Sequence, residues 1–509
     1  MTVSVADVNS HFDVAIIGLG PVGATLANLL GVSGTKVVVL EKETDIYALP
    51  RAVHFDDEVL RIFQAIGLAE QVLENSPFNP GMQFINDDGD LLLDWPRPTG
   101  VGEHQWQTSF HFHQPDLESV LRKGLQRFEQ VRVVKPANVT VVVPNEDQVS
   151  LCYKTGYDTE TLTADYVVGC DGAHSMLRQC MDVTVNDLGF RERWLVIDVL
   201  LKVDKPELGF CTVQYCTPDR PATYVRGPGN RRRWEIAVKT DEAESDVISH
   251  DSVWRLLQKW LTPDDAEIER VAVYTFHSMI ATNWRAGRLF IAGDAAHQMP
   301  PFMGQGMCAG IRDVSNLGWK LHSCISAGKV DEALLDTYQS ERVPHVMHYI
   351  ETAIRLGGLI NTCDTEEGLR LAFTPKGDSA QMKSITPLLG DGMVNDNYTG
   401  FNNDYTGTLA PQPLLASDAR LDDIVGYRFV LLVDAMLHHN LPDLSSEISV
   451  VDSAHSDVED LLRRYHCQAV LIRPDRYILG TANNVAEIAS LISFATRHAL
   501  LFAPPDRRL

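Results

Sequence analysis

The sequence predicts an α/β fold with more than one domain. The chain has 509 residues, which exceeds the size at which a single hydrophobic core keeps growing, so we expect two or three domains. Near the N-terminus, apolar strands alternate with a glycine-rich turn and a helix, the pattern of a Rossmann-like dinucleotide-binding unit. Residues 186–280 show alternating stretches instead, which predict a separate sheet with antiparallel strands.

The composition is that of an ordinary globular protein. Hydrophobic residues make up 45% and charged residues 22% of the chain, close to the globular average. The net charge of -24 argues against nucleic-acid binding, because phosphate contacts need clustered Lys and Arg. We find no signal peptide and no apolar run of 18 residues, so we expect no membrane segment and a cytoplasmic location. The nine cysteines form no CxxC pair and no metal-like spacing, which favours reduced thiols without a metal site.

The first element is a strand, residues 14–17, that runs into the hexapeptide Gly18-Leu19-Gly20-Pro21-Val22-Gly23 and a helix of small residues. Gly18 allows the tight turn, Gly20 lets the backbone approach a pyrophosphate, and Gly23 lets the helix pack closely on the strand. A second strand, residues 36–40, ends at Glu41, whose carboxylate can accept hydrogen bonds from a ribose. These parts together predict a site for the ADP half of FAD or NAD, and they do not distinguish the two.

Two further segments repeat the arrangement of an apolar strand followed by glycines and a helix. Residues 166–168 precede Gly169-Cys170-Asp171-Gly172, and residues 288–292 precede Gly293 and Asp294. An acid at the carboxyl end of a parallel strand commonly faces a ligand, so we expect Asp294 to bind a polyol chain. The following segment, "HQMPPFMGQGMCAGIRD", has prolines that stiffen a turn and glycines that allow a flat group to approach, and it begins a helix near Gly306.

These three blocks together resemble the single-component FAD-dependent aromatic hydroxylases, the family of para-hydroxybenzoate hydroxylase and phenol hydroxylase. The stretches "YALPRAVHFDDEVLRIFQAIGL", "QPDLESVLRKGLQRF" and "GQGMCAGIRDVSNLGWKL" are most similar to the 3-(3-hydroxyphenyl)propionate hydroxylase branch. The likeness covers residues 12–350 and is specific for flavin monooxygenases, but it says little about which phenol is used.

The resemblance implies a set of cofactor-binding residues. The ADP half of FAD would lie against the first glycine motif and the end of the second strand, at Gly18, Gly20, Pro21, Val22, Gly23, Glu41 and Lys42. Arg51 would reach the pyrophosphate or ribose, Gln114 the ribityl or phosphate region, and Asp171 the pyrophosphate, with a part in NAD(P)H docking. The ribityl chain and the isoalloxazine would contact Gly293, Asp294, Pro301, Gly304, Gln305, Gly306 and Met307. We expect His297 and Cys308, in the same segment, to be packing residues.

The implied activity is oxygen insertion. FAD would be reduced by NAD(P)H and would react with O2 to a flavin C4a-hydroperoxide, which hydroxylates a phenolic substrate inside a pocket closed to water. Candidate substrate contacts are His54, Tyr215, Tyr224, Arg226 and Pro300, none with a motif that assigns a role. A base near the phenol hydroxyl is expected, but the sequence does not identify it. We also expect a homodimer.

The resemblance divides the chain into four segments. Residues 1–185 and 281–400 would form the FAD-binding domain, and residues 186–280 the substrate-binding sheet. Residues 401–509 resemble the thioredoxin-like C-terminal domain of some relatives, and without a CxxC pair we expect no redox activity there. Relatives usually carry glycine after Arg-Pro-Asp, where this chain has Arg476.

Three alternative functions remain open at this point. A flavin-dependent halogenase would carry a WxWxIP stretch, and this chain has no WxW. A flavin oxidase or dehydrogenase would turn over without inserting oxygen into a substrate. A non-catalytic flavin-binding protein would have no need for the flat cradle between Gly293 and Gly310.

Overall fold

The computed structural model describes residues 10–48, 51–217, 219–362, 382, 384–393, 404–415, 418–439, 441–442 and 448–499. In chain order the strands are β1 (Ser10–Ile17), β2 (Val37–Leu40), β3 (His54–Asp56), β4 (Gly81–Ile85), β5 (Leu91–Pro96), β6 (Ser109–His111), β7 (Val131–Val134), β8 (Asn138–Pro144), β9 (Val149–Thr155), β10 (Asp158–Gly169), β11 (Val185–Leu201), β12 (Thr212–Tyr215), β13 (Ala222–Arg226), β14 (Arg231–Ala237), β15 (Ala266–Ala281), β16 (Arg285–Ala286), β17 (Leu289–Ile291), β18 (His297–Gln298), β19 (Phe429–Val433), β20 (Ile448–Asp452), β21 (Ala469–Ile472) and β22 (Ile478–Ala482). The α-helices are α1 (Pro21–Val32), α2 (Asp57–Ala65), α3 (Ala69–Leu73), α4 (Gln114–Gly124), α5 (Met176–Cys180), α6 (Glu244–Val247), α7 (His250–Leu257), α8 (Gly306–Ala327), α9 (Glu332–Thr362), α12 (Leu421–Val425), α13 (Ala435–His438), α14 (Ser456–Arg464) and α15 (Val485–Ala499). Short 3-10 helices are η1 (Leu125–Arg127), η2 (Pro206–Leu208), η3 (Gly293–Ala295) and η4 (Pro301–Met303).

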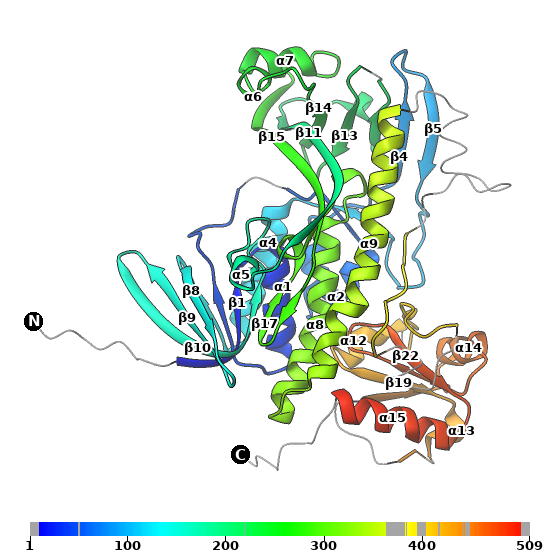
Figure 1. The fold of residues 1–509 in the computed structure, drawn as a ribbon. Coiled ribbons are helices and arrows are strands. Elements are labelled where there is room, and N and C mark those ends of the chain that lie inside the picture. Colours follow the sequence, from blue (N-terminus) through cyan, green and yellow to red (C-terminus); the bar gives the residue numbers. More distant parts are fainter. Residues whose placement is uncertain are drawn as a thin grey trace, which may run out of the picture.

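The first sheet has the order β16-β17-β10-β1-β2-β7 and is parallel from β17 to β7, whereas β16 is antiparallel to β17; β9 pairs with β10, and β8 pairs with β9 (Figure 1). Its central strands are buried on both faces, which explains their continuous apolar sequence. In the parallel register, Ile17 of β1 pairs with Leu40 and Gly169, and Gly169 pairs with Ile291. The carboxyl ends of β1, β2, β10 and β17 therefore meet at one edge, and all three glycine motifs begin there.

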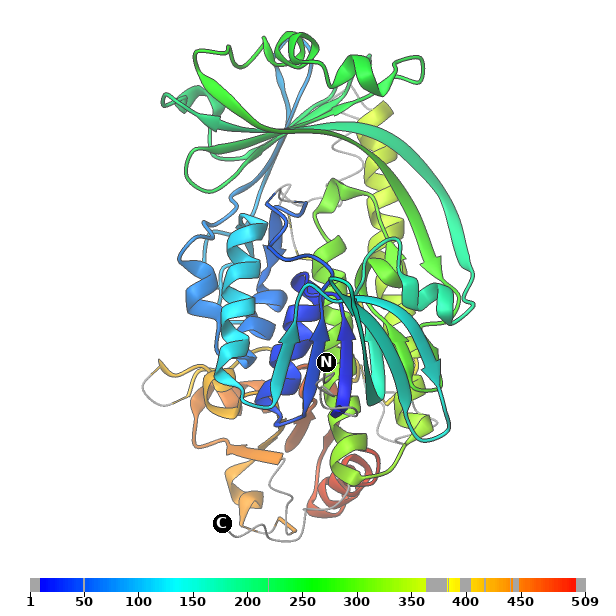
Figure 2. The ribbon, with the colours of Figure 1, turned by 90° about the vertical axis from the view of Figure 1, so that its left-hand side faces the viewer.

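The second sheet has the order β18-β15-β11-β14-β13-β12-β4-β5 and lies at the top of the molecule in Figures 1 and 2. Its outer face packs on α7 through a core that includes Leu195, Tyr224 and Trp234. Its opposite face, here called the inner face, contributes Trp194 and other side chains to a cluster with Phe302 of η4. We call these buried residues the inner-face cluster: Met82, Phe84, Leu92, Leu93, Trp194, Cys216, Phe302, Leu356 and Ile360.

Residues 81–96 join this second sheet although they precede most of the first sheet in the sequence. β4 pairs in parallel with β12, with Gln83 opposite Val213, and β5 then forms the edge. With β18 at its other edge, the sheet therefore combines strands from three separated segments, two of which lie outside residues 186–280.

The C-terminal part has a four-stranded sheet in the order β20-β19-β21-β22, with α14 and α15 on it. One face of β19 shares the core of the first domain, where Phe429 contacts the ring of Trp319 in α8. The other face packs on α14. The α/β class with several mixed sheets is confirmed, whereas the thioredoxin-like assignment stays a prediction.

A buried charge cluster joins the C-terminal part to α8 and α9. The Glu341 carboxylate, with no exposed surface, accepts hydrogen bonds from Arg473 at 2.8 Å and Lys320 at 2.7 Å. Although burial opposes ionisation, the charge of Arg473 lowers the pKa of Glu341. Asn316 of α8 donates to the same carboxylate at 2.7 Å. These bonds replace the water that each charge has lost.

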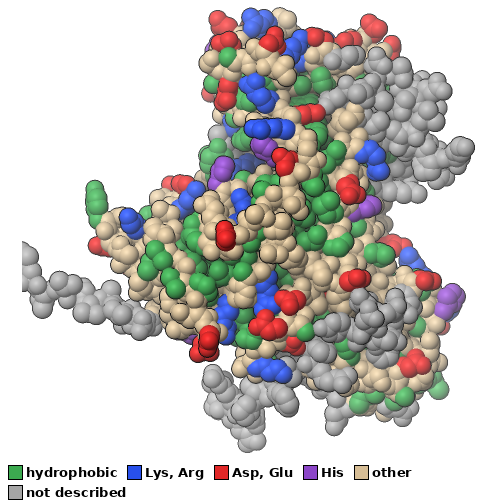
Figure 3. Space-filling view, in the orientation of Figure 1, with side chains coloured by type: hydrophobic (Ala, Val, Ile, Leu, Met, Phe, Trp, Pro, Cys, Tyr) green, Lys and Arg blue, Asp and Glu red, His purple; other side chains and the backbone are tan. Residues whose placement is uncertain are grey.

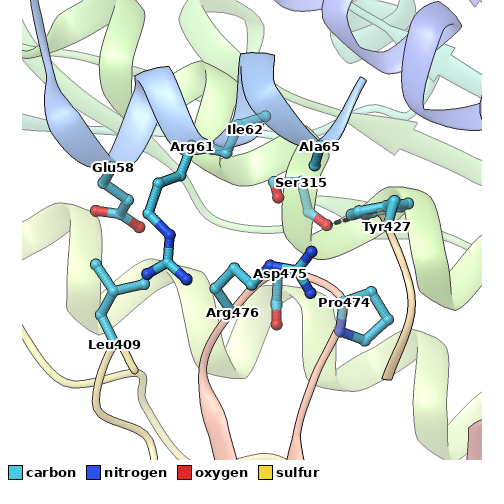
Figure 4. Close-up of a pocket in the computed structure, with 10 residues that line it drawn as sticks. All are labelled: Glu58, Arg61, Ile62, Ala65, Ser315, Leu409, Tyr427, Pro474, Asp475 and Arg476. Carbon is cyan, nitrogen blue, oxygen red and sulfur yellow. Dashed lines mark hydrogen bonds between the residues drawn. The ribbon is translucent and has the colours of Figure 1, made fainter. Parts of the chain in front are cut away.

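A second contact lies nearby, where α2 and α8 meet the segment after β21 around a small cavity (Figure 4). Asp422 is paired there with Arg61 at 2.8 Å and with Arg476 at 3.1 Å. Arg476 has a left-handed φ of 69°, a backbone conformation that glycine adopts without strain. The glycine that the resemblance predicts at this position would therefore fit the observed backbone.

The visible surface carries both signs of charge. In Figure 3, Lys and Arg side chains lie among Asp and Glu rather than in one basic patch. Among the helices that the structure describes, none combines the length and the apolar character that a membrane crossing requires.

Candidate active site

The glycine motif between β1 and α1 forms a tight turn with one open position. Gly18 has a φ of 99°, and a Cβ there would lie 2.5 Å from the Cys170 carbonyl oxygen. A Cβ on Gly23 would lie 2.1 Å from the Gly18 carbonyl oxygen, whereas one on Gly20 would meet nothing within 4 Å. α1 starts at Pro21 without a side-chain cap. The turn therefore presents free backbone in front of a helix N-terminus, where a pyrophosphate fits.

Glu41 closes β2 next to this turn. Its Oε2 accepts a hydrogen bond from the Leu19 amide at 2.6 Å, and its Oε1 accepts one from the Glu43 amide at 2.8 Å. Each carboxylate oxygen retains acceptor capacity for a ribose hydroxyl. The neighbouring Lys42 side chain is 70% exposed. The position fits the predicted ribose contact, and Glu41 also holds the glycine turn in place.

Gln114 holds the segment that carries Arg51. Its side-chain oxygen accepts from the amides of Arg51 and Ala52, both at 2.9 Å, and its nitrogen donates to Glu118 at 2.8 Å. The guanidinium of Arg51 is exposed and lies over the ring of Tyr47. The side chain of Gln114 is thus engaged within the protein, and the Arg51 side chain is the accessible one of the two.

Asp171 lies beside the glycine turn at the end of β10. Its Oδ2 accepts from the amides of Met176 and Leu177 at 2.8 and 3.2 Å, so it fixes the start of α5. Its Oδ1 is buried and lacks a hydrogen-bond partner among the described residues. The carboxylate can therefore accept one more hydrogen bond from a ligand or water.

The third motif packs directly on the first. A Cβ on Gly310 would lie 2.7 Å from Val22 Cγ2 and 2.9 Å from Gly293 Cα, so both glycines are needed for this close approach. The Gly293 amide donates to Asp313 at 3.1 Å. The three motifs, far apart in the sequence, thus form one continuous surface.

Asp294 provides a free carboxylate on this surface. The side chain is exposed, and it makes no hydrogen bond or ion pair in the part of the chain that is described. Even so, the surrounding protein atoms raise its pKa through desolvation. The Asp294 carboxylate is thus surrounded by protein atoms but still accessible, and it can accept hydrogen bonds from the hydroxyls of a polyol.

The start of α8 offers a second uncapped helix N-terminus. Gly304 has a left-handed φ of 63°, and Gln305 caps the helix without a side-chain hydrogen bond to it. The Gln305 side chain instead donates to Asp56 and accepts from Arg312, both at 3.0 Å. Backbone N–H groups at Gly306 and Met307 are thereby left for an electron-rich ring edge.

His297 is held by partners that lie farther along the chain. Its Nε2 lies 2.6 Å from Asp313, which also pairs with Arg342 at 3.0 Å. A packing role for His297 agrees with this fully buried position. No motif or spacing in the sequence pairs Asp313 with either residue.

The ribbon of β3 and β6 has one apolar and one polar face. Phe55 and Phe110 stack within the hydrophobic core. His54 lies on the polar face, with Nε2 2.7 Å from the Ser109 hydroxyl and Nδ1 3.4 Å from the Gly304 carbonyl oxygen. Burial, with a further effect of the Arg97 charge, lowers the pKa of His54 to about 4. The polar face therefore meets the loop that precedes α8.

The other predicted substrate contacts divide between the two sides of the second sheet. Tyr215 and Tyr224 pack in the outer core, where Tyr215 contacts Trp260 and Tyr224 contacts Trp234. Arg226 lies two residues from Tyr224 on the same strand face and covers Phe210. Tyr215 and Tyr224 thus pack away from the loop before α8. The charge of Arg226 acts on His111, which lies opposite His54, and Pro300 and His54 lie in or beside the loop.

Comparisons with known proteins agree with the interpretation of this surface as an FAD site. The FAD binding domain family matches residues 11–353. A probable NADH-specific resorcinol 4-hydroxylase from Rhodococcus jostii is 36% identical over 94% of this chain and 93% of its own length. The chain belongs to this FAD-binding family. A 3-(3-hydroxy-phenyl)propionate/3-hydroxycinnamic acid hydroxylase from Shigella sonnei is 30% identical, covering 96% of both chains.

Solved structures agree on the fold. The flavin-dependent monooxygenase PieE, solved with FAD and substrate, has a TM-score of 0.81 at 20% identity and covers 97% of this chain and 100% of its own. The substrate-free rebeccamycin biosynthetic enzyme REBC has a TM-score of 0.77 at 21% identity, covering 97% and 100%. The predicted function is confirmed: the protein is an FAD-dependent aromatic hydroxylase, a monooxygenase that uses FAD and NAD(P)H. The oxidase and non-catalytic alternatives are not favoured.

Proposed function

We propose that this enzyme hydroxylates a small phenol of the resorcinol type, a 1,3-dihydroxybenzene, with NADH as the reductant. This proposal is supported by the sequence identity of 36% to the Rhodococcus protein named for that reaction, compared with 30% to the hydroxyphenylpropionate hydroxylase. A substrate without a charged side chain also suits the apolar inner-face cluster, which adjoins η4.

FAD would be held by the surface that the three motifs form. The first motif would contact the ADP half through Gly18, Gly20, Pro21, Val22, Gly23, Glu41 and Lys42. Arg51 and Asp171 would contact the pyrophosphate, and Gln114 would act by holding the Arg51 segment. Asp294 would bind the ribityl hydroxyls beside Gly293, and the isoalloxazine would lie along Pro301, Gly304, Gln305, Gly306 and Met307. The main support for this FAD site is the open backbone at Gly20. Among the three glycines of the first motif, it is the one where a Cβ would meet no atom within 4 Å.

The protein contributes orientation, charge and exclusion of water. FAD, when bound, takes a hydride from NAD(P)H and activates O2 for transfer to the ring. The N-terminus of α8 would supply positive potential to the pyrimidine edge of the bound flavin. The apolar inner-face cluster, which includes Phe302 of η4, would exclude water beside the bound flavin and so limit loss of oxygen as peroxide.

A phenol panel tests this proposal. The purified, FAD-loaded protein is mixed with resorcinol, phenol or 3-(3-hydroxyphenyl)propionate, and consumption of NADH and of NADPH is followed together with product mass. We expect resorcinol to stimulate NADH oxidation most and to yield a product with one added oxygen. Stimulation that produces only hydrogen peroxide with every phenol would contradict the proposal.

The assembly and the domain division are part of the same proposal. We propose that the enzyme is a cytoplasmic homodimer, that residues 186–280 together with β4 and β5 form the substrate domain, and that 401–509 is a packing domain. Light scattering of the holoenzyme tests the dimer, and a mass equal to one chain would contradict it.

A further inference from the structure

The polar face of the β3 and β6 ribbon contains a histidine whose ring has few polar neighbours, among them the Val53 carbonyl. His111 lies directly opposite His54 in the antiparallel register, so the two side chains share one face. His111 is 2% exposed, and neither ring nitrogen has a hydrogen-bond partner among the described residues. Both ring nitrogens of His54, in contrast, lie near protein oxygens. Buried polar groups are normally satisfied, so His111 is suited to meet a ligand.

Arg97 is an equally unusual neighbour. Its side chain is 7% exposed, and no ion pair or hydrogen bond of its guanidinium is found in the described part of the chain. The Arg97 amide donates to Pro80, and the adjacent Asn79 donates to Ser109, so the Arg97 segment lies beside β6. Asp56 and Asp57 lie near enough for their charges to act on Arg97, but neither pairs with it directly. A buried guanidinium without a direct ion pair among the described residues is a strong site for an anionic oxygen.

These two groups lie together next to the proposed flavin site. His54 connects them to that site. A Cβ on Gly304, in the loop before α8, would lie 3.0 to 3.2 Å from atoms of the His54 side chain, so this side chain packs directly against the loop. Charged and titratable groups also approach from other elements. The groups that act on His111 are His54, Arg97, Arg226 and the Val53 carbonyl, and those that act on Arg97 are Asp56 and Asp57.

We propose that Arg97 and His111 receive the reacting hydroxyl of the phenolic substrate, with His111 as proton acceptor and Arg97 as the partner of the phenolate oxygen. This inference rests on the proposed function. The O–H bond of the phenol breaks, its electron pair stays on oxygen, and the proton forms an N–H bond on the imidazole. Nothing is oxidised or reduced in this step. The phenolate is more electron-rich than the phenol, which favours attack by an electrophilic oxygen.

The protonation states of the free protein fit this division of roles. Burial lowers the pKa of His111 to about 3, and the neighbouring His54 adds to the effect, so the imidazole is neutral at pH 7 and its ring can receive the proton, but a pKa this low disfavours the transfer until the phenolate forms beside Arg97. Burial lowers the pKa of Arg97 only to about 10, so its charge is kept. A bound phenolate offsets the positive charge of Arg97 and makes protonation of His111 more favourable.

The test compares four FAD-loaded variants with the wild type over a range of pH. They are His111→Asn, Arg97→Gln, the charge-conserving Arg97→Lys and the control His104→Gln. His104 is a buried histidine near the same ribbon, but its Nδ1 lies 2.9 Å from Asp57. Each variant is assayed for kcat/KM with the phenol that the wild type hydroxylates best, for FAD content and for NADH oxidation without substrate.

We expect His111→Asn to lower kcat/KM about 100-fold at pH 7, with FAD content and substrate-free NADH oxidation retained. The loss should shrink as the pH rises toward the pKa of the free phenol, because the substrate then arrives ionised. Arg97→Gln should raise KM, Arg97→Lys should restore part of the loss, and His104→Gln should resemble the wild type. A loss of equal size at every pH, or no loss, would overturn the inference and leave the proposed function intact. A wild type that hydroxylates no phenol would overturn both.

Discussion

Replacement of Glu341 by glutamine should destabilise the contact between α9 and the C-terminal part. The variant keeps the size of the side chain but removes the negative charge that faces Arg473 and Lys320, and the side chains of all three residues have no exposed surface. Removing one partner of a buried ion pair costs about 3–5 kcal/mol, because the remaining charges stay buried without compensation. We expect a loss of that size in the free energy of unfolding.

The control lies on the same helix. Asp336 pairs with Arg285, but its side chain is 71% exposed, so Asp336→Asn should cost less than about 1 kcal/mol. Urea denaturation at pH 7.5, followed by tryptophan fluorescence, measures both variants. A double variant, Glu341→Leu with Arg473→Met, should be less destabilised than the sum of its single changes. Equal and small effects at Glu341 and Asp336 would refute the idea that the buried cluster holds the C-terminal part in place.

Three further predictions concern the cofactor site and pH. Gly18→Ala should prevent stable folding because its Cβ would clash with Cys170, whereas Gly20→Ala should fold with normal thermal stability but weaker FAD binding; melting curves and FAD titration compare them. Asp294→Ala should weaken FAD binding by about 10- to 100-fold, since hydrogen bonds to charged groups contribute about 1.5–3 kcal/mol, as measured by fluorescence titration of the apoprotein. The free energy of unfolding should fall as the pH drops from about 6.5 to 4. In the folded protein the pKa of His54 is about 4 and that of His111 about 3, so both rings stay neutral over this range, whereas the same histidines in the unfolded chain take up protons. Urea midpoints at several pH values follow this, and a variant with asparagine at both positions should have a flatter profile.

Each of these predictions has an outcome that contradicts it. Equal FAD affinity of the Gly20→Ala variant and the wild type would mean that no ligand approaches that backbone. An unchanged affinity after Asp294→Ala would remove this carboxylate from the proposed ribityl contact. An identical pH profile in the double asparagine variant would mean that other groups account for the acid sensitivity.

The parts that the sequence predicts well are those encoded within one short segment. The hexapeptide from Gly18 to Gly23 lies between its strand and its helix, and two of its glycines have local reasons: Gly18 has a left-handed φ of 99°, and a Cβ on Gly23 would lie 2.1 Å from the Gly18 carbonyl oxygen. The helix that begins at Gly306 follows from the same kind of pattern. Such features need only the period of apolar residues and the special φ angles of glycine.

Features that depend on pairing between distant segments could not be predicted. Alternation along β13 shows that Tyr224 and Val225 face opposite sides, but nothing local says which side faces the flavin. The pairing of β4 with β12 and of His54 with His111 depends on register between strands far apart in the chain. Asp313 is one acidic residue among 68 Asp and Glu in the sequence, and only the fold reveals that His297 and Arg342 both bind it.

The split origin of the second sheet has a consequence for how such enzymes can be recombined. A chimera that exchanges only the contiguous stretch between β11 and β15 would graft a foreign β12 beside the resident β4, and that seam is parallel and spans Thr212–Tyr215. Exchanges that carry both pieces together would preserve the seam. Substrate preference should accordingly change during evolution more readily through coordinated substitutions in β4 and β12 than through exchange of the whole segment from β11 to β15.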